Sequence, residues 1–262
     1  MASWVRFEHQ GNSGFGRIDG LVENAGAVIT VHTGSMFESS DTGQTVAVTD
    51  VRLLAPVMPG KIVALWNNFH ELSAKLGTAV PAEPLYFLKA TSSLLDPGGT
   101  IQVPPSYAGK VVFEGELGVV IGQTCRGVSE AEAESMIFGY TCVNDVTAQD
   151  ILNADPSFAQ WARCKSFDTF GPCGPAVVTG LDPAQLCIRT VLNGQERQNY
   201  PVADMILSPA RIVSLLSREM TLHPGDMIAC GTSVGVGSMR PGATVEVSIE
   251  GIGTLRNHMA AA

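Results

Sequence analysis

In Phe113-Glu114-Gly115-Glu116-Leu117-Gly118-Val119-Val120-Ile121-Gly122, two acidic residues come just before an almost continuous apolar run. A run of this length is typical of a β-strand that is covered on both faces. Side chains at positions i and i+2 of a strand share a face, so Glu114 and Glu116 present two carboxylates side by side. Like charges at the edge of a core are costly unless they are neutralised, and a divalent cation with oxygen ligands is the natural partner. The alternative is that Glu114 begins the strand in solvent and Glu116 is an exposed edge residue.

A second acidic position ends another apolar stretch, Gly139-Tyr140-Thr141-Cys142-Val143-Asn144-Asp145. On a strand, Asp145 would project from the strand end. Three carboxylates on neighbouring strand ends would form a half-filled oxygen site that leaves positions for substrate and water, which suits Mg²⁺ or Mn²⁺. The alternative is that Asp145 forms an Asx turn that caps a helix over residues 146–153.

A lysine and an aspartate follow among aromatic and turn residues, in Cys164-Lys165-Ser166-Phe167-Asp168. In a closed pocket, Lys165 can hold an enolate or carboxylate oxygen, and desolvation would lower its pKa. The alternative is an ordinary surface lysine in a loop.

The N-terminal part of the chain differs in pattern from the rest. Residues 1–56 alternate apolar and polar positions between glycine-rich turns, which predicts a small antiparallel β unit. Residues 53–60 contain two prolines, which cannot donate to a ladder, and therefore predict an extended connector. We place a boundary there, with a small N-terminal β unit over residues 1–57 and the main domain over residues 58–262.

Two helices of the main domain have clear end signals. Ser129 and Glu132 form a capping box, and Gly139 is in place to end that helix in a left-handed conformation. The other helix begins at Ser208, with Pro209 at the first helical position. Strand-like segments greatly outnumber these helices. The predicted fold class is therefore mainly β with a few helices (α+β).

The composition excludes several classes of function. With 16 Lys+Arg against 25 Asp+Glu the formal net charge is −9, and the absence of a basic run argues against a nucleic-acid binder. No segment approaches the roughly 18 consecutive apolar residues of a membrane helix, and Arg6 and Glu8 stand where a signal peptide is apolar. The six cysteines contain no C-x-x-C pair and read as buried, reduced thiols. We expect a cytoplasmic protein with small-molecule or protein partners, no nucleic acid and no membrane.

The glycine-rich segment from Gly231 to Gly237 formally allows two other interpretations, a phosphate-binding loop and a nucleophile elbow. Both need a helix directly after the glycines. The segment that follows, Ser238-Met239-Arg240-Pro241-Gly242-Ala243-Thr244-Val245, predicts a turn and a strand, so we disfavour both.

Five ordered motifs between about Pro56 and Gly253 resemble the fumarylacetoacetate hydrolase family. They are E-x-E-L-x-V-V-I-G, G-Y-x-x-x-N-D-V-T-A-x-D, K-S-F-D-x-F-x-P-x-G-P, N-G-x-x-R-Q and P-G-D-x-I-x-x-G-T-x-x-G-V-G. The resemblance implies a mixed β-roll that is usually homodimeric, preceded by the family's small N-terminal β unit. It also implies a divalent metal, commonly Mg²⁺ with Mn²⁺ or Ca²⁺ possible in its place, and a small oxo-acid substrate.

The resemblance assigns roles to individual residues. Glu114, Glu116 and Asp145 match the metal ligands, Lys165 matches the active-site lysine, and Thr232 matches a threonine that helps to hold a substrate carboxylate. The metal would chelate the 2-oxo and carboxylate oxygens of the substrate and act as a Lewis acid.

This chain also departs from the family pattern, in which a segment like G-x-N-Y-x-x-H-x-x-E supplies a His and Glu dyad on a mobile lid. When the two are aligned on Asn68 and Phe69, Leu72 and Lys75 stand in the places of the dyad. His70 and Glu71 lie nearby, and either can act in its place if the lid folds over the metal; the alternative is that His70 only decorates the helix.

Two further positions differ. Gln149 replaces a basic residue that often follows the metal aspartate, and Lys89-Ala90 replaces a frequent Lys-Pro. The loss of one charge indicates a different or less acidic substrate. We take Thr232, Gln149 and Asn68 as the candidate substrate-binding residues.

The expected function is a divalent-metal-dependent hydrolase that cleaves a carbon-carbon bond in a small oxo acid, such as an acylpyruvate or a fumarylacetoacetate-like β-dicarbonyl. One alternative is a decarboxylase or isomerase of a 2-hydroxydienoate or an oxo-dicarboxylic acid. The other is a catalytically weakened binding protein.

Overall fold

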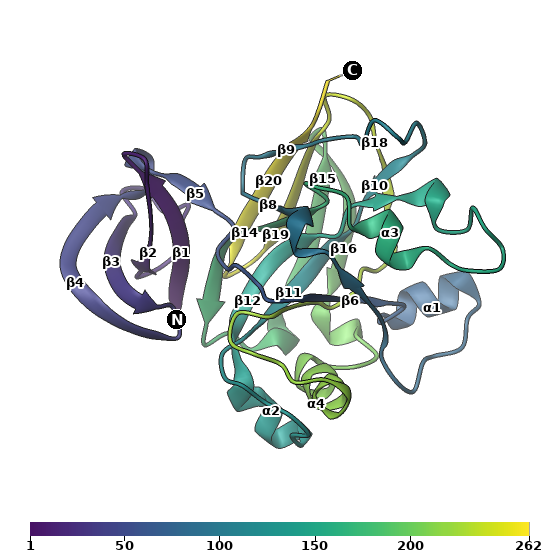
Figure 1. The fold of residues 1–262 in the computed structure, drawn as a ribbon, viewed down its shortest axis with the longest axis horizontal. Helices are drawn as coiled ribbons and strands as arrows, with labels where there is room; N and C mark the ends of the chain where they lie inside the picture. Colours follow the sequence, from purple (N-terminus) through teal and green to yellow (C-terminus); the bar gives the residue numbers. More distant parts are fainter. Residues whose placement is uncertain (262) are drawn as a thin grey trace.

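A long mixed sheet runs through the molecule, from the N-terminal strands at one side to the strands that lie beside α1 at the other (Figure 1). The computed structural model describes residues 1–261. Strands of this sheet follow the order β4-β3-β2-β1-β14-β12-β11-β17-β6-β7, with β5 paired to β1 and β8 to β14. Its twelve members are β1 (Ala2–His9), β2 (Asn12–Ile18), β3 (Val28–Ser35), β4 (Glu38–Ala47), β5 (Arg52–Leu54), β6 (Ile62–Trp66), β7 (Leu85–Lys89), β8 (Leu94–Leu95), β11 (Gly115–Ile121), β12 (Ile137–Asn144), β14 (Gly171–Thr179) and β17 (Met227–Ala229).

Two smaller sheets complete the roll. The first has the order β16-β15-β19-β20-β9 and the second the order β13-β10-β18. Their strands are β9 (Thr100–Ile101), β10 (Val111–Phe113), β13 (Thr147–Ala148), β15 (Cys187–Leu192), β16 (Gln195–Pro201), β18 (Gly237–Met239), β19 (Thr244–Ile249) and β20 (Gly253–Met259). The glycine-rich loop before β18 therefore leads into strands and not into a helix, as the sequence predicts.

Within residues 1–261, four α-helices accompany the sheets: α1 (His70–Leu76), α2 (Glu130–Met136), α3 (Trp161–Lys165) and α4 (Pro209–Glu219). Both predicted caps are present, because the Ser129 and Glu132 side chains form the capping box of α2 and the Ser208 hydroxyl accepts from Arg211 N in α4. α2 and α4 pack together at one end of the roll, whereas α1 and α3 lie on the side away from the N-terminus (Figure 1). No helix of the described chain has the length and apolar character needed to cross a bilayer. The mainly β fold with a few helices is confirmed.

Every residue of β11 is buried, which agrees with its apolar sequence. β11 pairs with β12 on one side and with β17 on the other, both antiparallel. The register places Gly115 opposite Asn144, so the chain just beyond β12 returns to the point where β11 begins. Asp145 N donates to Glu114 O at 2.9 Å there. This pairing brings two acidic segments together that are about thirty residues apart in the chain.

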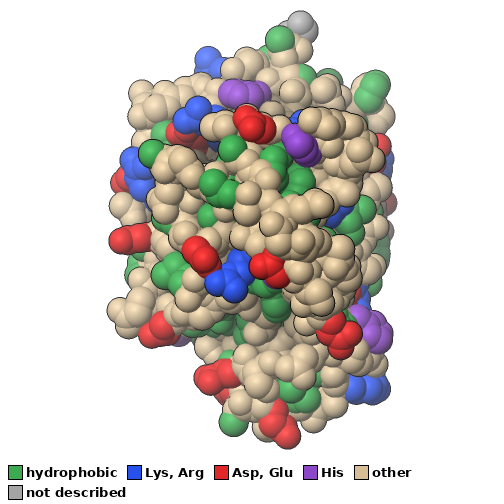
Figure 2. Space-filling view, turned by 90° about the vertical axis from the view of Figure 1, so that its left-hand side faces the viewer, with side chains coloured by type: hydrophobic (Ala, Val, Ile, Leu, Met, Phe, Trp, Pro, Cys, Tyr) green, Lys and Arg blue, Asp and Glu red, His purple; other side chains and the backbone are tan. Residues whose placement is uncertain are grey.

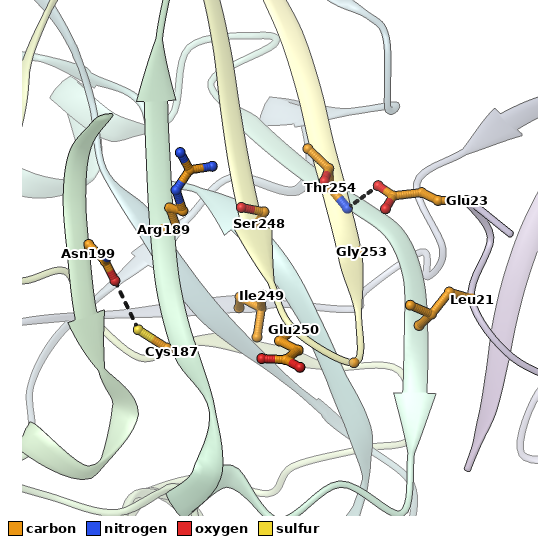
Figure 3. A pocket seen from close by; sticks show the side chains of 11 residues that line it. Leu21, Glu23, Cys187, Arg189, Asn199, Ser248, Ile249, Glu250, Gly253 and Thr254 are labelled. Carbon is orange, nitrogen blue, oxygen red and sulfur yellow. Dashed lines mark hydrogen bonds between the residues drawn. The ribbon is translucent and has the colours of Figure 1, made fainter. Parts of the chain in front are cut away.

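The N-terminal strands continue the long sheet, because β1 pairs with β14. The turn that follows β2 also contacts the outer face of the five-stranded sheet, where the Glu23 carboxylate accepts from Thr254 N at 2.6 Å (Figure 3). A cavity of about 350 Å³ lies at this contact. On the face of the molecule that Figure 2 shows, acidic, basic and apolar side chains are intermixed.

The same cavity contains the exception to one prediction. Five of the six free cysteines are buried, but Cys187 on β15 is exposed. Its Sγ contacts Asn199 Oδ1 at 3.1 Å (Figure 3). The polar outer face of the β15–β16 pair leaves this thiol in solvent.

The predicted end of the first helix is wrong. α2 ends at Met136 and the chain passes directly into β12, so Gly139 is a strand residue and not a helix cap. A methyl group on Gly139 would overlap the carbonyl oxygen of Val178 in β14. The glycine is therefore required by the close approach of two strands and not by a left-handed turn.

Gly139→Ala should lower the midpoint of thermal unfolding by several degrees, because the new methyl group meets backbone that cannot move without disturbing the β12–β14 pairing. Overpacking of this kind costs roughly 1–3 kcal/mol. Gly237→Ala is a matched control in β18, where the methyl group would meet side-chain atoms of Arg197 and Phe113 at 3.3 to 3.5 Å. Melting curves followed by circular dichroism would contradict this assignment if the two variants lost equal stability.

Candidate active site

Three carboxylates meet at the start of β11. One oxygen from each of Glu114, Glu116 and Asp145 lies within 4.8 Å of the others. Glu116 is 0% exposed and Asp145 is 1% exposed, whereas Glu114 is partly buried. The alternative of exposed glutamates is therefore wrong. The alternative of a helix over residues 146–153 is also wrong, because this segment forms β13 and a short 3₁₀ turn over Gln149–Ile151.

Two buried lysines face these carboxylates. Lys165 Nζ donates to Glu114 Oε2 at 2.8 Å and to Asp145 Oδ2 at 2.6 Å. Lys89 Nζ pairs with Asp145 Oδ1 at 2.9 Å and also donates to the carbonyl oxygen of Lys165. Lys165 lies at the end of α3 and not in a surface loop. With both ammonium groups counted, the formal charge of the cluster is −3 + 2 = −1.

One carboxylate oxygen of the cluster is left without a partner. Glu116 Oε2 accepts from Gly231 N at 2.9 Å, but Glu116 Oε1 is buried and has no hydrogen bond. A buried acceptor without a donor is costly, and here it stands beside two further carboxylates. All three groups are hard oxygen donors, which is the ligand set that Mg²⁺, Mn²⁺ and Ca²⁺ take. The residues present therefore fit a divalent cation.

Burial and charge shift the titration of these groups. Burial raises the pKa of Glu116 well above its ordinary value, and the charge of Asp145 raises it further. Burial would lower the pKa of Lys165, but the charges of Asp145, Glu114 and Glu116 outweigh it and the pKa is raised. The sequence-based expectation of a lowered pKa for Lys165 is thus wrong, because it counted desolvation without the three anions. Burial lowers the pKa of Lys89, although Asp145 opposes the shift.

The backbone between the two glutamates is fixed by side chains of β16 and of the loop between β17 and β18. Gly115 N donates to Gln198 Oε1 at 3.0 Å, and Gly115 O accepts from the Tyr200 hydroxyl and from Thr232 Oγ1. Gln198 Nε2 in turn donates to Thr232 Oγ1 at 2.9 Å. Thr232, which the sequence analysis assigns to substrate binding, therefore lies at the site, but its hydroxyl is also part of the support for β11. A Cβ on Gly115 would overlap the side chain of Thr190.

Three residues of this arrangement are not among the site residues that the sequence predicts. Lys89 stands out in the sequence only for the alanine that follows it, and Gln198 only as the end of the N-G-x-x-R-Q motif. Tyr200 belongs to none of the five motifs. A usable signal existed for Lys89, because a lysine at the end of the largely apolar segment Leu85-Tyr86-Phe87-Leu88 needs a buried anion as a partner.

In the described part of the chain, the other candidate residues make no hydrogen bond or ion pair with the three carboxylates. His70 and Glu71 are exposed at the start of α1, where Glu71 N donates to Asp204 Oδ2 at 3.1 Å. Asn68 is buried, but its side-chain amide donates to Leu207 O and Cys230 O and accepts from Leu207 N, and it so connects two loops. Gln149 is exposed at the start of a 3₁₀ turn.

The chain belongs to the fumarylacetoacetate hydrolase family. A family model described as fumarylacetoacetate (FAA) hydrolase C-terminal matches residues 61–260, and one described as Rv2993c-like, N-terminal, matches residues 3–56. Relatives of this chain include proteins named as a hydrolase and as isomerases.

Individual relatives cover most of the chain. Protein Rv2993c of Mycobacterium tuberculosis is 45% identical over 219 residues, which is 82% of this chain and 81% of the relative. A 2,4-didehydro-3-deoxy-L-rhamnonate hydrolase of a Sphingomonas species is 38% identical over 211 residues, 76% of this chain and 73% of the relative. The crystal structure of a 2-hydroxyhepta-2,4-diene-1,7-dioate isomerase from Mycobacterium marinum superposes with a TM-score of 0.91 at 38% identity, covering 100% of this chain and 99% of that one.

Binding of Mn²⁺ should release protons and should strengthen as the pH rises. The raised pKa of Glu116 leaves this carboxyl protonated at a pH where an ordinary glutamate is ionised, so a cation has to displace that proton. Calorimetry in two buffers of different ionisation enthalpy, on either side of neutral pH, measures both effects. Glu116→Gln should bind Mn²⁺ at least about tenfold more weakly without proton release. An affinity that is independent of pH and of this substitution would contradict the metal assignment.

Lys89→Met should tighten Mn²⁺ binding at least about fivefold and weaken the binding of an anionic ligand, because it changes the formal charge of the cluster from −1 to −2. Methionine keeps much of the side-chain volume, and Asp145 keeps its contact with Lys165. Lys110→Met, at an exposed lysine, is the control and should leave both affinities unchanged. Weaker Mn²⁺ binding in Lys89→Met would show that Lys89 acts by holding Asp145 in place and not through its charge.

Proposed function

We propose that this protein is a divalent-metal-dependent hydrolase that cleaves a carbon-carbon bond in a small oxo acid of the acylpyruvate or β-dicarbonyl class. The observation that carries the proposal is the pairing of the carboxylates of Glu114, Glu116 and Asp145, of which the last two are buried, with Lys165, whose raised pKa keeps it protonated. Family membership supports it, since a hydrolase of a deoxy sugar acid is among the relatives.

The metal, when bound by the three carboxylates, supplies a Lewis acid for the oxo and carboxylate oxygens of the substrate. Side chains of the protein stabilise the charge that develops on the substrate and hold the carboxylates in position. The Lys165 ammonium can donate to a substrate oxygen that gains negative charge and so stabilise an enolate. Lys89 holds Asp145 from the opposite side, and Gln198 and Tyr200 fix the strand that carries the glutamates.

Hydrolysis also needs a base that activates water. His70 is the proposed base and Glu71 its partner, and both begin α1, a helix of seven residues that is largely exposed. In this proposal α1 moves toward the carboxylates when substrate binds. The φ of +64° at Gly77, which ends the helix, and the exposed segment beyond it provide a hinge.

Isomerisation is the second candidate, and a specific feature favours it. Leu72 and Lys75 stand where many family members carry the water-activating dyad, and isomerisation of a 2-hydroxydienoate moves a proton without attack by water. The superposable isomerase from Mycobacterium marinum supports this alternative. Decarboxylation of an oxo-dicarboxylic acid would use the same stabilised enolate.

Incubation of the Mn²⁺-loaded protein with acetylpyruvate, oxaloacetate and a 2-hydroxydienoate distinguishes these functions. The expected result is a pair of acids from acetylpyruvate, and Glu116→Gln should abolish this turnover while its melting curve keeps the wild-type shape. Release of CO₂ from oxaloacetate alone would indicate a decarboxylase. A spectral shift of the dienoate without fragments would indicate an isomerase, and no reaction with metal bound would indicate a binding protein.

A further inference from the structure

A cavity of about 560 Å³ opens beside the two lysines of the candidate active site. It is formed by the end of β6, the segment around β7 and the first residue of α3. Its wall is apolar and mainly aromatic, and the residues that line it are Trp66, Pro84, Leu85, Tyr86, Phe87 and Trp161.

The cavity and the carboxylate cluster are built from the same elements. Phe87 and Lys89 are two residues apart on β7 and therefore share a face of that strand. Trp161 and Lys165 are four residues apart on α3 and therefore share a face of that helix. Lys165 Nζ lies 5.6 Å from the centre of the Phe87 ring. The aromatic residues of the cavity wall are therefore direct neighbours of the two lysines of the site.

The aromatic rings hold one another in place. The ring of Phe87 stacks on that of Trp161 with 5.6 Å between the ring centres and an interplanar angle of 19°, and the ring of Trp66 also lies 5.6 Å from that of Trp161, tilted by 48°. Rings that are fixed in this way lose little freedom when a ligand binds. The cavity is therefore already shaped for an occupant.

The charges around the site distinguish between possible occupants. The six lining residues include no lysine, arginine or histidine, and Gln149 contributes no charge at the position where the family often has a basic residue. The ammonium groups of Lys89 and Lys165 beside the cavity already pair with Asp145 and Glu114, so a second carboxylate against this wall would gain no cationic partner of its own. An apolar or aromatic group would gain by leaving water.

We propose that this cavity receives the distal part of the substrate, and that this part is an apolar or aromatic acyl group and not a second carboxylate. The proposal rests on the proposed function, because it takes the reacting end of the substrate to lie at Glu114, Glu116 and Asp145. It selects acylpyruvates with a bulky, uncharged acyl group from the wider class of oxo acids. The occupant is the substrate because Phe87, which lines the cavity, lies 5.6 Å from Lys165 Nζ, and Lys165 contacts two of the three carboxylates.

Ligand binding tests the proposal without any need for turnover. Calorimetry of the Mn²⁺-loaded protein should show phenylpyruvate binding at least about tenfold more tightly than oxaloacetate, because only the first carries an apolar tail. Phenylpyruvate should also change the tryptophan fluorescence, and Trp161→Phe should reduce that change. Tighter binding of oxaloacetate would overturn the proposal.

A pair of variants on β7 locates the effect. Leu85 lines the cavity and is 42% exposed, so Leu85→Arg should fold and should lower the preference for phenylpyruvate over oxaloacetate at least about tenfold. Leu88 is 50% exposed on the same strand and does not line the cavity, so Leu88→Arg is the matched control and should keep the preference. Equal effects of the two substitutions would overturn the proposal.

Turnover and oligomeric state distinguish a failure of the cavity assignment from a failure of the proposed hydrolysis. If benzoylpyruvate and acetylpyruvate are cleaved with equal kcat/KM, the cavity does not select the acyl group, although the proposed function stands. If neither is cleaved while phenylpyruvate still binds with the stated preference, the proposed hydrolysis fails but the cavity assignment stands. If Leu85→Arg alters the oligomeric state in solution and leaves the ligand preference unchanged, the cavity is an interface between copies of the chain and the proposal is overturned.

Discussion

The arrangement of the protein depends on the balance of charge around Asp145. This carboxylate is buried between two ammonium groups, with Lys165 on one oxygen and Lys89 on the other, and two further carboxylates stand beside it. Each of these charges would be unfavourable in the interior alone, and removal of any one leaves others without compensation. The cluster therefore requires that β7, β11, β12 and α3 keep their relative positions to within a hydrogen-bond length.

The strand pairings and local contacts of the fold meet this requirement. The β11–β12 register places Asp145 beside Glu114, and Gly115 allows the side chain of Thr190 to approach the strand between the two glutamates. Gln198 bonds to Gly115 N and Tyr200 to Gly115 O, so a polar pair from β16 fixes the same residue from both sides. Buried polar groups that satisfy one another in this way specify a single geometry. Such rigidity is what a metal site needs from its support.

Sequence patterns identified the groups whose relation is local. The i and i+2 spacing of Glu114 and Glu116 was enough to place both carboxylates on one face, and the capping residues Ser129 and Ser208 marked where two helices begin. Groups brought together only by tertiary structure were harder to find. Lys89 and Tyr200 give no periodic signal, because their hydrogen-bond partners at the site are more than thirty residues away in the chain. Gly139 is an example, since a glycine shortly after a helix usually predicts a helix cap. Its actual role is to leave room for the backbone of Val178, and that contact exists only when β12 and β14 are paired.

Lys89 also changes how an anionic molecule would approach this protein. The whole chain carries a formal net charge of −9 and so repels anions at long range. At the cluster, three carboxylates and two ammonium groups with a divalent ion would sum to −3 + 2 + 2 = +1, which attracts them. The sign of the electrostatic field would then reverse only within about one Debye length of the site, roughly 8 Å at physiological salt. An anion would thus be attracted only close to the site. Added salt would screen the long-range repulsion by the net charge of the chain, and it would weaken the short-range attraction by the metal-loaded cluster much less.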